Sequence, residues 1–272
     1  WRKVAKINPN VQDFKEYSTY AFTGETTFEK IAPDGQIKHG TLSDAGFANK
    51  LDTYAKIMGL TRHDIINDDL GMLSSMSQKV GRGAGLALNL AFWIEWLADN
   101  LTFYTTARGN YISGAGSVLA SAGLEAAHKA FMAQSGSDGN PLGAVPKYLA
   151  VPTDLEITAE ELMTSTNLNS GSGETKAKAP NRNVFAGKYE VVPSSYLNHA
   201  KVTGGSATAW WLTADPLDLP LIEVGFLRGA LAPTVEEVAM DPHYLGIEIR
   251  GYFDFGVRKQ VYQAAVKSKG AA

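Results

Sequence analysis

The feature that most constrains this chain is a helical repeat of apolar residues between about residues 67 and 97. The apolar positions follow one another mostly at steps of three and four, and they are Met72, Met76, Val80, Leu86, Leu90, Trp93, Ile94 and Leu97. Asn67, Asp68 and Asp69 precede them, and such side chains cap a helix and suit the positive end of its dipole. We therefore predict one helix of about 30 residues, or roughly 45 Å, which is long for the core of a globular domain.

Three glycines, Gly81, Gly83 and Gly85, interrupt the middle of this predicted helix. Each costs up to ~1 kcal/mol relative to Ala, so we expect a bend or a close approach of another backbone there. The segment superficially resembles a dinucleotide-binding loop, but that motif requires a strand before it and a helix that begins at it. We therefore predict no cofactor site.

The stretch from Tyr20 to about Arg62 predicts a long projecting hairpin. Its first strand includes Phe22 and Phe28, a turn follows at 33–35, and a β-rich segment at 54–60 comes only after the small and polar stretch 40–49. A loop of roughly 35–40 residues is well above the usual length of a connection, and such loops are normally functional or disordered. The strand-like residues along this loop favour a functional loop over a disordered one.

The opening stretch, residues 1–20, predicts an extended arm in which Pro9 breaks any regular run. A frayed terminus is the alternative. Trp1 stands where an initiating Met is expected, and either removal of an upstream segment by a protease or an artificial boundary accounts for it.

The remainder of the chain is β-rich with short helices. Helices are predicted at 117–134 and 154–163, a buried strand at 148–151, and a low-complexity loop at 167–181. Five further strands are predicted at 188–192, 208–213, 222–227, 234–240 and 246–258. Together with the long helix these elements predict an α+β fold.

Composition excludes several functions. The chain of 272 residues has a formal net charge of -3 and no cysteine, so disulfides, thiolate nucleophiles and cysteine metal sites are excluded. Tight wrapping of nucleic acid is disfavoured because it needs many Lys and Arg contacts to phosphate. No apolar run approaches the ~20 residues of a membrane helix, so no membrane partner is predicted.

No catalytic, metal or cofactor residues are predicted. The five histidines lie far apart in the sequence, without metal-ligand spacing. Asp68 and Asp69 are explained as helix caps, and 137–140 as a turn, because the ligand ladder and terminal Glu of a calcium loop are missing. The Trp residues suggest packing instead: Trp93 in the core, and Trp96 and Trp211 against a neighbouring subunit, where large aromatic side chains are favoured.

Several motifs occur in order over nearly the whole chain. They are Val11-x-Asp13-Phe14-Lys15, the segment IINDDLG at 65–71, Asp138-Gly139-x-Pro141-Leu142, Pro146-x-Tyr148-Leu149-x-Val151-Pro152, Ala214-Asp215-Pro216, Ile222-Glu223-Val224-x-Phe226-Leu227 and Asp254-Phe255-Gly256. In these motifs the chain resembles the major capsid proteins of tailed bacteriophages, in the Mu-like major head subunit (gpT-like) family, which has the Hong Kong 97-like fold. The glycine-rich segment 81–85 and the loop 167–181 depart from the pattern.

The resemblance implies a division into five parts. It assigns 1–22 to an N-terminal arm and 23–62 to an extended loop that overlaps a neighbouring subunit. It assigns 63–135 to a peripheral domain with the long spine helix, 136–232 to an axial domain near the capsomer centre, and 233–272 to return strands of the peripheral domain.

The resemblance also implies function and partners. Copies of the chain would assemble into hexamers and pentamers of an icosahedral shell around double-stranded DNA, in the bacterial host cytoplasm and then in the virion. A portal, a prohead protease and a cement or decoration protein are further expected partners. We expect the assembly interface to include nine residues, which are Lys3, Phe14, Phe28, Pro33, Phe47, Tyr54, Arg62, Trp96 and Trp211.

Two alternatives remain open at this point. One is an enzyme with an unrecognised site, for example a hydrolase that uses dispersed Asp and His residues. The other is a different phage shell or an encapsulin-like shell, which has the same fold without these motifs. Shells or hexameric rings seen by negative-stain microscopy would separate an assembling protein from an enzyme.

Overall fold

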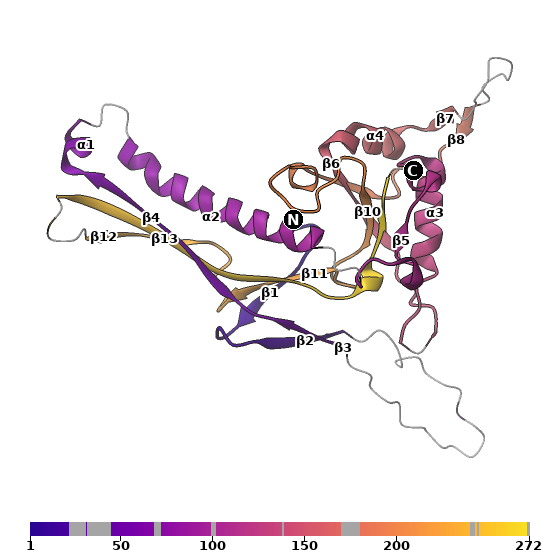
Figure 1. Cartoon of the computed structure of the whole chain (residues 1–272), viewed down its shortest axis with the longest axis horizontal. Coiled ribbons are helices and arrows are strands. Elements are labelled where there is room, and N and C mark those ends of the chain that lie inside the picture. Colours follow the sequence, from indigo (N-terminus) through magenta and orange to yellow (C-terminus); the bar gives the residue numbers. More distant parts are fainter. Residues whose placement is uncertain are drawn as a thin grey trace.

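The computed structural model of the chain describes residues 1–21, 31, 45–67, 72–98, 102–137, 139–169, 180–239, 243 and 245–270. Two five-stranded sheets and one long helix organise these residues (Figure 1). Sheet 1 contains β1 (Lys6–Val11), β4 (Asp52–Thr61), β11 (Ile222–Leu227), β12 (Thr234–Ala239) and β13 (Gly246–Lys259). Sheet 2 contains β5 (Tyr111–Ile112), β6 (Pro146–Pro152), β9 (Glu190–Ser194), β10 (Trp210–Ala214) and β14 (Ala265–Ser268). The predicted α+β class is confirmed.

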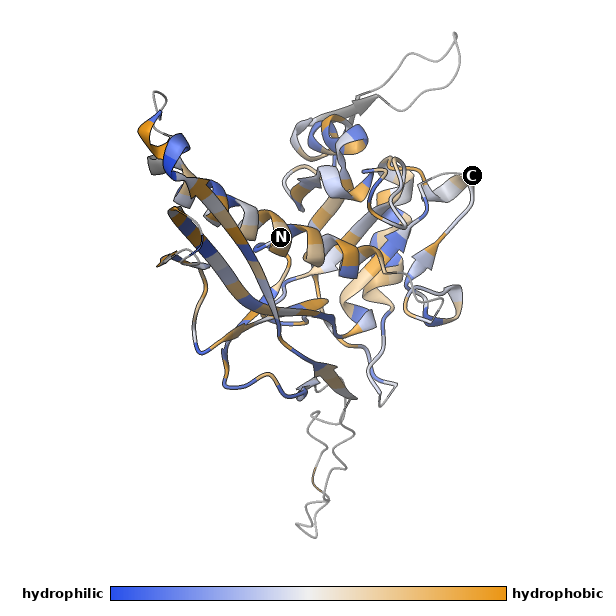
Figure 2. Cartoon of the chain, turned by 60° about the vertical axis from the view of Figure 1, so that its left-hand side comes forward, coloured by the Kyte–Doolittle hydropathy of each residue, from blue (hydrophilic) through white to orange (hydrophobic). Residues whose placement is uncertain are grey.

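Sheet 1 is built on β13, which pairs antiparallel with β4, β11 and β12. Its predicted alternation is observed, because Ile249 and Phe253 are buried whereas Arg250 between them is exposed. The helix α2 (Met72–Leu97) packs along the face that carries these buried residues. Hydrophobic residues interleave with hydrophilic ones along β4 and β13 in Figure 2.

Sheet 2 has the order β5-β14-β10-β6-β9. The helix α3 (Ser121–Met132) packs against β14 and β10, and α4 (Thr153–Thr164) packs against β6 and β9. All five residues of the central strand β10 are buried. The strands predicted at 148–151 and 208–213 and the helix predicted at 154–163 are therefore confirmed within a few residues.

The long helix α2 confirms the central prediction, although residues 68–71, where its cap was expected, lie outside the described part of the chain. Of the bend or close backbone approach predicted at Gly81, Gly83 and Gly85, the close approach is not observed, because a Cβ added at any of them meets no described atom within 4 Å. Among the described helices, none is both long enough and apolar enough to cross a membrane.

Local details differ from the prediction at three helix starts. A short helix, α1 (Arg62–Ile66), was missed, although Thr61 and Asp64 form a capping box at its start. The helix predicted from residue 117 begins at Ser121, because 115–117 form a separate 3-10 turn. The helix predicted from residue 154 begins at Thr153, with Pro152 as an N-cap that makes no side-chain hydrogen bond.

Part of the predicted arm is integrated into sheet 1. β1 pairs parallel with β11, and Val4 and Ala5 are buried. The Trp1 ring lies 6.0 Å from Phe92 and 6.4 Å from Phe226 between centroids. Residues 1–11 therefore pack on their own subunit, because a parallel strand and its buried neighbours cannot also extend freely.

Each sheet contains strands from more than one of the residue ranges that the resemblance assigns to the peripheral and axial domains. β11, inside the expected axial range 136–232, belongs to sheet 1, whereas β14, inside the return range 233–272, belongs to sheet 2. α3, inside the peripheral range 63–135, packs on sheet 2. Strand β7 (Asn167–Asn169) pairs with β8 (Pro180–Arg182) at the ends of the low-complexity loop, and 170–179 lie outside the described residues.

Candidate assembly surfaces

The base of the predicted extended loop is a two-stranded ribbon. β2 (Tyr17–Ala21) and β3 (Ala45–Asn49) pair antiparallel, and the register ends at Ala21 opposite Ala45. Figure 1 shows the ribbon beside β1, at the lower edge of the molecule. Phe47, one of the expected interface residues, is only partly buried and packs against the main core from β3.

A buried carboxylate fastens this ribbon to sheet 1. Glu223 on β11 has an exposed fraction of 0%, and its Oε1 accepts hydrogen bonds from Asn8 Nδ2 (3.2 Å), Tyr17 Oη (3.2 Å) and Thr19 Oγ1 (3.0 Å). Asn49 Nδ2 donates to Tyr17 Oη at 3.0 Å. Since the donors to Glu223 come from β1 and β2, the carboxylate joins these two strands to β11, and Asn49 links β3 to the network through Tyr17.

The electrostatics of this network follow from its burial. Burial, and then the neighbouring Glu223 carboxylate, raise the pKa of the Tyr17 phenol well above its ordinary value. Gly225 makes room for the phenol, because a Cβ there would lie 2.3 Å from Tyr17 Oη. Glu223 was not singled out from the sequence; the signal for it was a single acid inside the apolar strand IEVGFL.

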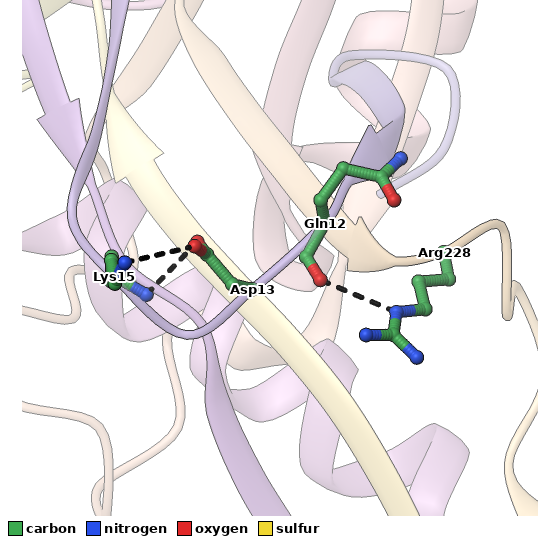
Figure 3. A network of polar contacts seen from close by, with 4 residues as sticks. All are labelled: Gln12, Asp13, Lys15 and Arg228. Atoms are coloured by element: carbon green, nitrogen blue, oxygen red, sulfur yellow. Dashed lines mark hydrogen bonds and ion pairs between the residues drawn. The ribbon is translucent and has the colours of Figure 1, made fainter.

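Phe14 lies in the turn between β1 and β2, and its side chain is 44% exposed. Figure 3 shows the contacts that fix this turn, made by residues 12, 13 and 15 around position 14 in the sequence. Arg228 Nε donates to the Gln12 carbonyl at 3.3 Å, and the Lys15 backbone N–H donates to Asp13 Oδ1 at 3.2 Å. Phe14 is therefore an apolar side chain held out to solvent by an ordered turn, which suits a contact residue.

Tyr54 and Arg62 lie at the two ends of β4. Within the described residues β4 pairs only with β13, so its other edge is open. The Tyr54 ring is 41% exposed and stacks on Phe255 at 4.3 Å between centroids, and burial followed by Asp52 raises its pKa. Arg62 is exposed where β4 meets α1.

A groove opens beside Tyr54. It has a volume of about 390 Å³, and Lys50, Ala91, Ile94 and Arg258 are among its lining residues. Ile94 continues a stripe on the outer side of α2, in which Leu86, Leu90 and Ile94 are 48%, 39% and 48% exposed. Three large aliphatic side chains in a row at steps of four make an exposed apolar surface of the kind that proteins use for contacts.

Lys3 is exposed but engaged in its own subunit. Its Nζ lies 2.5 Å from Glu190 Oε1 on β9, and this hydrogen bond raises the pKa of Lys3. A contact with a neighbour therefore competes with an existing ion pair.

Two of the expected interface residues are wrong. Trp96 and Trp211 are each only 1% exposed, and their ring centroids lie 6.2 Å apart inside the subunit. The expectation that Trp211 packs against a neighbouring subunit failed because β10 is a central strand and all five of its residues are buried within the subunit. Phe28 and Pro33 lie outside the described residues.

The described residues do not gather into a metal-binding cluster. In that part of the chain, no group of three or more His, Cys, Asp or Glu side chains is placed to hold a metal ion. These surfaces are suited to contacts with other proteins. They consist of an open strand edge, exposed aliphatic and aromatic side chains, and charged residues near them.

Comparison with known proteins identifies the family. The sequence profile of a family described as phage capsid protein matches residues 47–268. No curated protein matches the chain in sequence.

Solved structures agree in fold. The capsid of a native GTA particle has a TM-score of 0.63 at 12% identity, covering 100% of this chain and 89% of that one. The capsid of cyanophage P-SCSP1u has a TM-score of 0.56 at 13% identity, covering 100% and 87%. A chain of Mycobacterium phage Ogopogo has a TM-score of 0.55 at 14% identity, covering 97% and 89%. The predicted Hong Kong 97-like fold is confirmed, and the chain belongs to the phage capsid protein family.

Proposed function

We propose that copies of this major capsid protein form rings of five and six subunits, and that these rings close into an icosahedral shell around double-stranded DNA. The observation that carries the proposal is the family match over residues 47–268, together with the capsid fold over the whole chain. The role is structural, without turnover of a substrate.

The exposed surfaces support assembly by contacts that differ on the two partners. Phe14, Phe47 and Tyr54 lie on three different segments, and Arg62 lies beyond the other end of β4 from Tyr54, so these residues can meet different neighbours. Contacts of this heterologous kind build rings and shells, and many modest contacts act together in a closed particle. Lys3 joins them if its ion pair with Glu190 opens.

Further partners belong to the same proposal. The shell holds its DNA without sequence preference and carries a portal at one vertex, and a prohead protease and a cement or decoration protein act on it during maturation. The subunits assemble in the cytoplasm of the bacterial host and end in the virion. The net charge of -3 supports a weak hold on DNA, because few phosphate contacts are then made.

The first experiment is direct. The purified chain is concentrated and observed by negative-stain microscopy and analytical ultracentrifugation. We expect rings of five and six subunits or closed shells. A chain that stays monomeric at all concentrations and turns over a substrate would contradict the proposal.

A second experiment tests the extended loop. Because β2 and β3 end opposite each other at Ala21 and Ala45, residues 22–44 are replaced by Asn-Gly, a two-residue turn that closes such a hairpin. The expected variant unfolds like the wild type but forms no shells. A matched control shortens the loop at 170–179 to Gly-Ser. Shells formed by the 22–44 replacement would show that the loop assignment is wrong.

A further inference from the structure

Two surfaces of opposite charge lie at opposite edges of sheet 2. In the order β5-β14-β10-β6-β9, the edge at β5 and β14 carries basic residues, and α4 covers the edge at β6 and β9 with acidic ones. We name the first surface the basic edge; its members are Arg108, Lys267 and Lys269, together with Lys259 at the adjoining end of β13 of sheet 1, whose backbone N–H donates to Glu95 Oε1 at 3.1 Å. The segments that form it, 102–112 and 259–270, contain no Asp or Glu. This local excess of positive charge stands in a chain whose net charge is -3.

Aromatic rings hold the cations of the basic edge in place. The Arg108 guanidinium lies 4.2 Å from the centroid of Tyr262, and Lys259 Nζ lies 4.7 Å from that of Phe103. Lys267 Nζ lies 5.6 Å from the centroid of Tyr104. Side chains ordered in this way lose less freedom when they bind a partner.

A buried amide ties the two segments of the basic edge into one platform. Asn110 has an exposed fraction of 0%, and its Nδ2 donates to the carbonyls of Phe103 at 2.8 Å and Tyr262 at 3.2 Å. Its Oδ1 accepts from the Thr105 N–H at 2.9 Å, and its carbonyl accepts from the Lys267 N–H at 2.9 Å. The positions of the cations are therefore fixed by the fold.

The opposite edge carries four carboxylates on one helix. They are Asp154, Glu156, Glu160 and Glu161, and α4 has no Lys or Arg. Ala159, Leu162 and Met163 form the buried side of α4, whereas Asp154, Glu160 and Glu161 are exposed. Within the described parts of the chain none of the four makes an ion pair.

We propose that the basic edge of one copy binds α4 of the next copy around a ring. The proposal rests on the proposed function and specifies one contact within it. Opposite charges at opposite edges of one sheet make a head-to-tail contact, and repetition of such a contact by rotation closes a ring. Complementary charge also fixes the orientation of approach and suppresses contacts between like edges.

Packaged nucleic acid is the competing occupant of the basic edge. Cations interleaved with aromatic rings also suit phosphate and bases. A second copy is favoured because it accounts for both surfaces at once, whereas nucleic acid leaves the carboxylates of α4 without a role.

Charge reversal on exposed side chains tests the contact. Variant 1 is Arg108→Glu with Lys269→Glu, and variant 2 is Glu160→Lys with Glu161→Lys. The control, Lys79→Glu with Arg82→Glu on α2, changes the charge as much as variant 1 but lies beside sheet 1. Thermal unfolding is compared first, and rings are then counted by negative-stain microscopy and native mass spectrometry.

Each variant alone opposes like charges, so we expect its ring population to fall at least about tenfold, while the control keeps its rings. In an equimolar mixture, variants 1 and 2 can alternate around a ring, and surfaces of unlike charge then face each other at every contact. The mixture should therefore recover six-membered rings but not five-membered ones, since an odd ring cannot alternate. One chain with all four substitutions should recover both.

Three results would overturn the inference. The first is normal rings from variant 1 alone and from variant 2 alone. The second is no recovery of rings in the mixture. The third is normal shells from variant 1 together with weakened binding of a 30-base-pair duplex, which would assign the basic edge to nucleic acid. The proposed function fails separately, if the wild-type chain forms neither rings nor shells.

Discussion

The two ends of α2 have different surroundings. At its C-terminal end Phe92, Trp93 and Trp96 are 0–2% exposed, enclosed by both sheets and by Trp1. At its N-terminal end, among the side chains that the structure describes there, Met76 and Val80 are buried, in a small separate cluster with Leu60 and Ile249. One helix thus serves as a core element at one end and as a support for exposed surface at the other.

This difference indicates where stability and assembly reside. Buried apolar area supplies most of the free energy of folding, so it should be concentrated where the helix meets both sheets. The distal half, with β4 and β12, contributes less to stability and offers more surface to neighbours. The exposed stripe of Leu86, Leu90 and Ile94 lies on the solvent-facing side of the C-terminal half of α2, opposite the core residues. The comparison can be tested by substitutions at each end.

The largest effect is expected in the aromatic core. Trp211→Ala removes a ring that is 1% exposed and should lower the free energy of unfolding by about 3–5 kcal/mol. Urea denaturation of dissociated subunits, followed by circular dichroism, measures it. A loss below about 1 kcal/mol would contradict the inference that the core around the C-terminal end of α2 supplies most of the free energy of folding.

A smaller effect is expected where the extended loop joins sheet 1. A Cβ at Gly256 would lie 2.2 Å from the Lys50 carbonyl oxygen, so Gly256→Ala should cost about 1–3 kcal/mol through a forced backbone shift. Gly83→Ala is the matched control on α2, where a Cβ meets nothing within 4 Å, and it should stabilise by up to ~1 kcal/mol. Equal effects in the same denaturation assay would contradict the geometry.

Alkaline pH should reduce the contribution that Tyr17, at the base of the extended loop, makes to the free energy of unfolding. The pKa of Tyr17 is raised in the folded state, so its contribution to stability is complete below the unfolded pKa of about 10 and is lost as pH rises above it. Each such group adds a slope of at most about 1.4 kcal/mol per pH unit. Tyr17→Phe should therefore lose stability less steeply than wild type between pH 10 and 11. Parallel slopes would count against the buried network around Glu223.

The smallest effect on stability is expected on the exposed stripe of α2. Leu90→Ser, at 39% exposed, should change the free energy of unfolding by within about 0.5 kcal/mol but reduce the yield of shells. Leu88→Ser, two residues away and 3% exposed, is the contrast and should destabilise the subunit strongly. Full shell yield from Leu90→Ser would show that the stripe is not a contact surface.

Much of the fold was predictable from periodicity. Strand alternation located β11, β12 and β13 closely, and three- and four-residue steps located α2, because these patterns reflect burial on one face. α1 was missed because it is only five residues long with no buried residue, although its capping box is visible in the sequence. The parallel pairing of β1 with β11 has no local signal, since its partners are more than 200 residues apart.

The interface was predicted less well than the fold, for a physical reason. In the sequence, an exposed aromatic residue such as Tyr54 looks the same as a buried one such as Trp211. Only the position of each strand within its sheet distinguishes the exposed residue from the buried one. Trp211 lies on a central strand covered on both sides, whereas Tyr54 lies on an edge strand. Neither the order of strands nor the opposite charges at the two edges of sheet 2 can be read from sequence spacing.

The strand pairing of β1 with β11 also governs when the subunit can fold. Asn8 and Glu223 are separated by 215 positions, so a ribosome needs about 10–40 s to make the acceptor after the donor. During this time β11, the strand that pairs with β1 in the described part of the chain, has not been made, so β1 exposes an edge that other nascent chains can pair with. Because β11 ends at residue 227, this contact can close only after nearly the whole chain has left the ribosome, and closure of so distant a contact is slow.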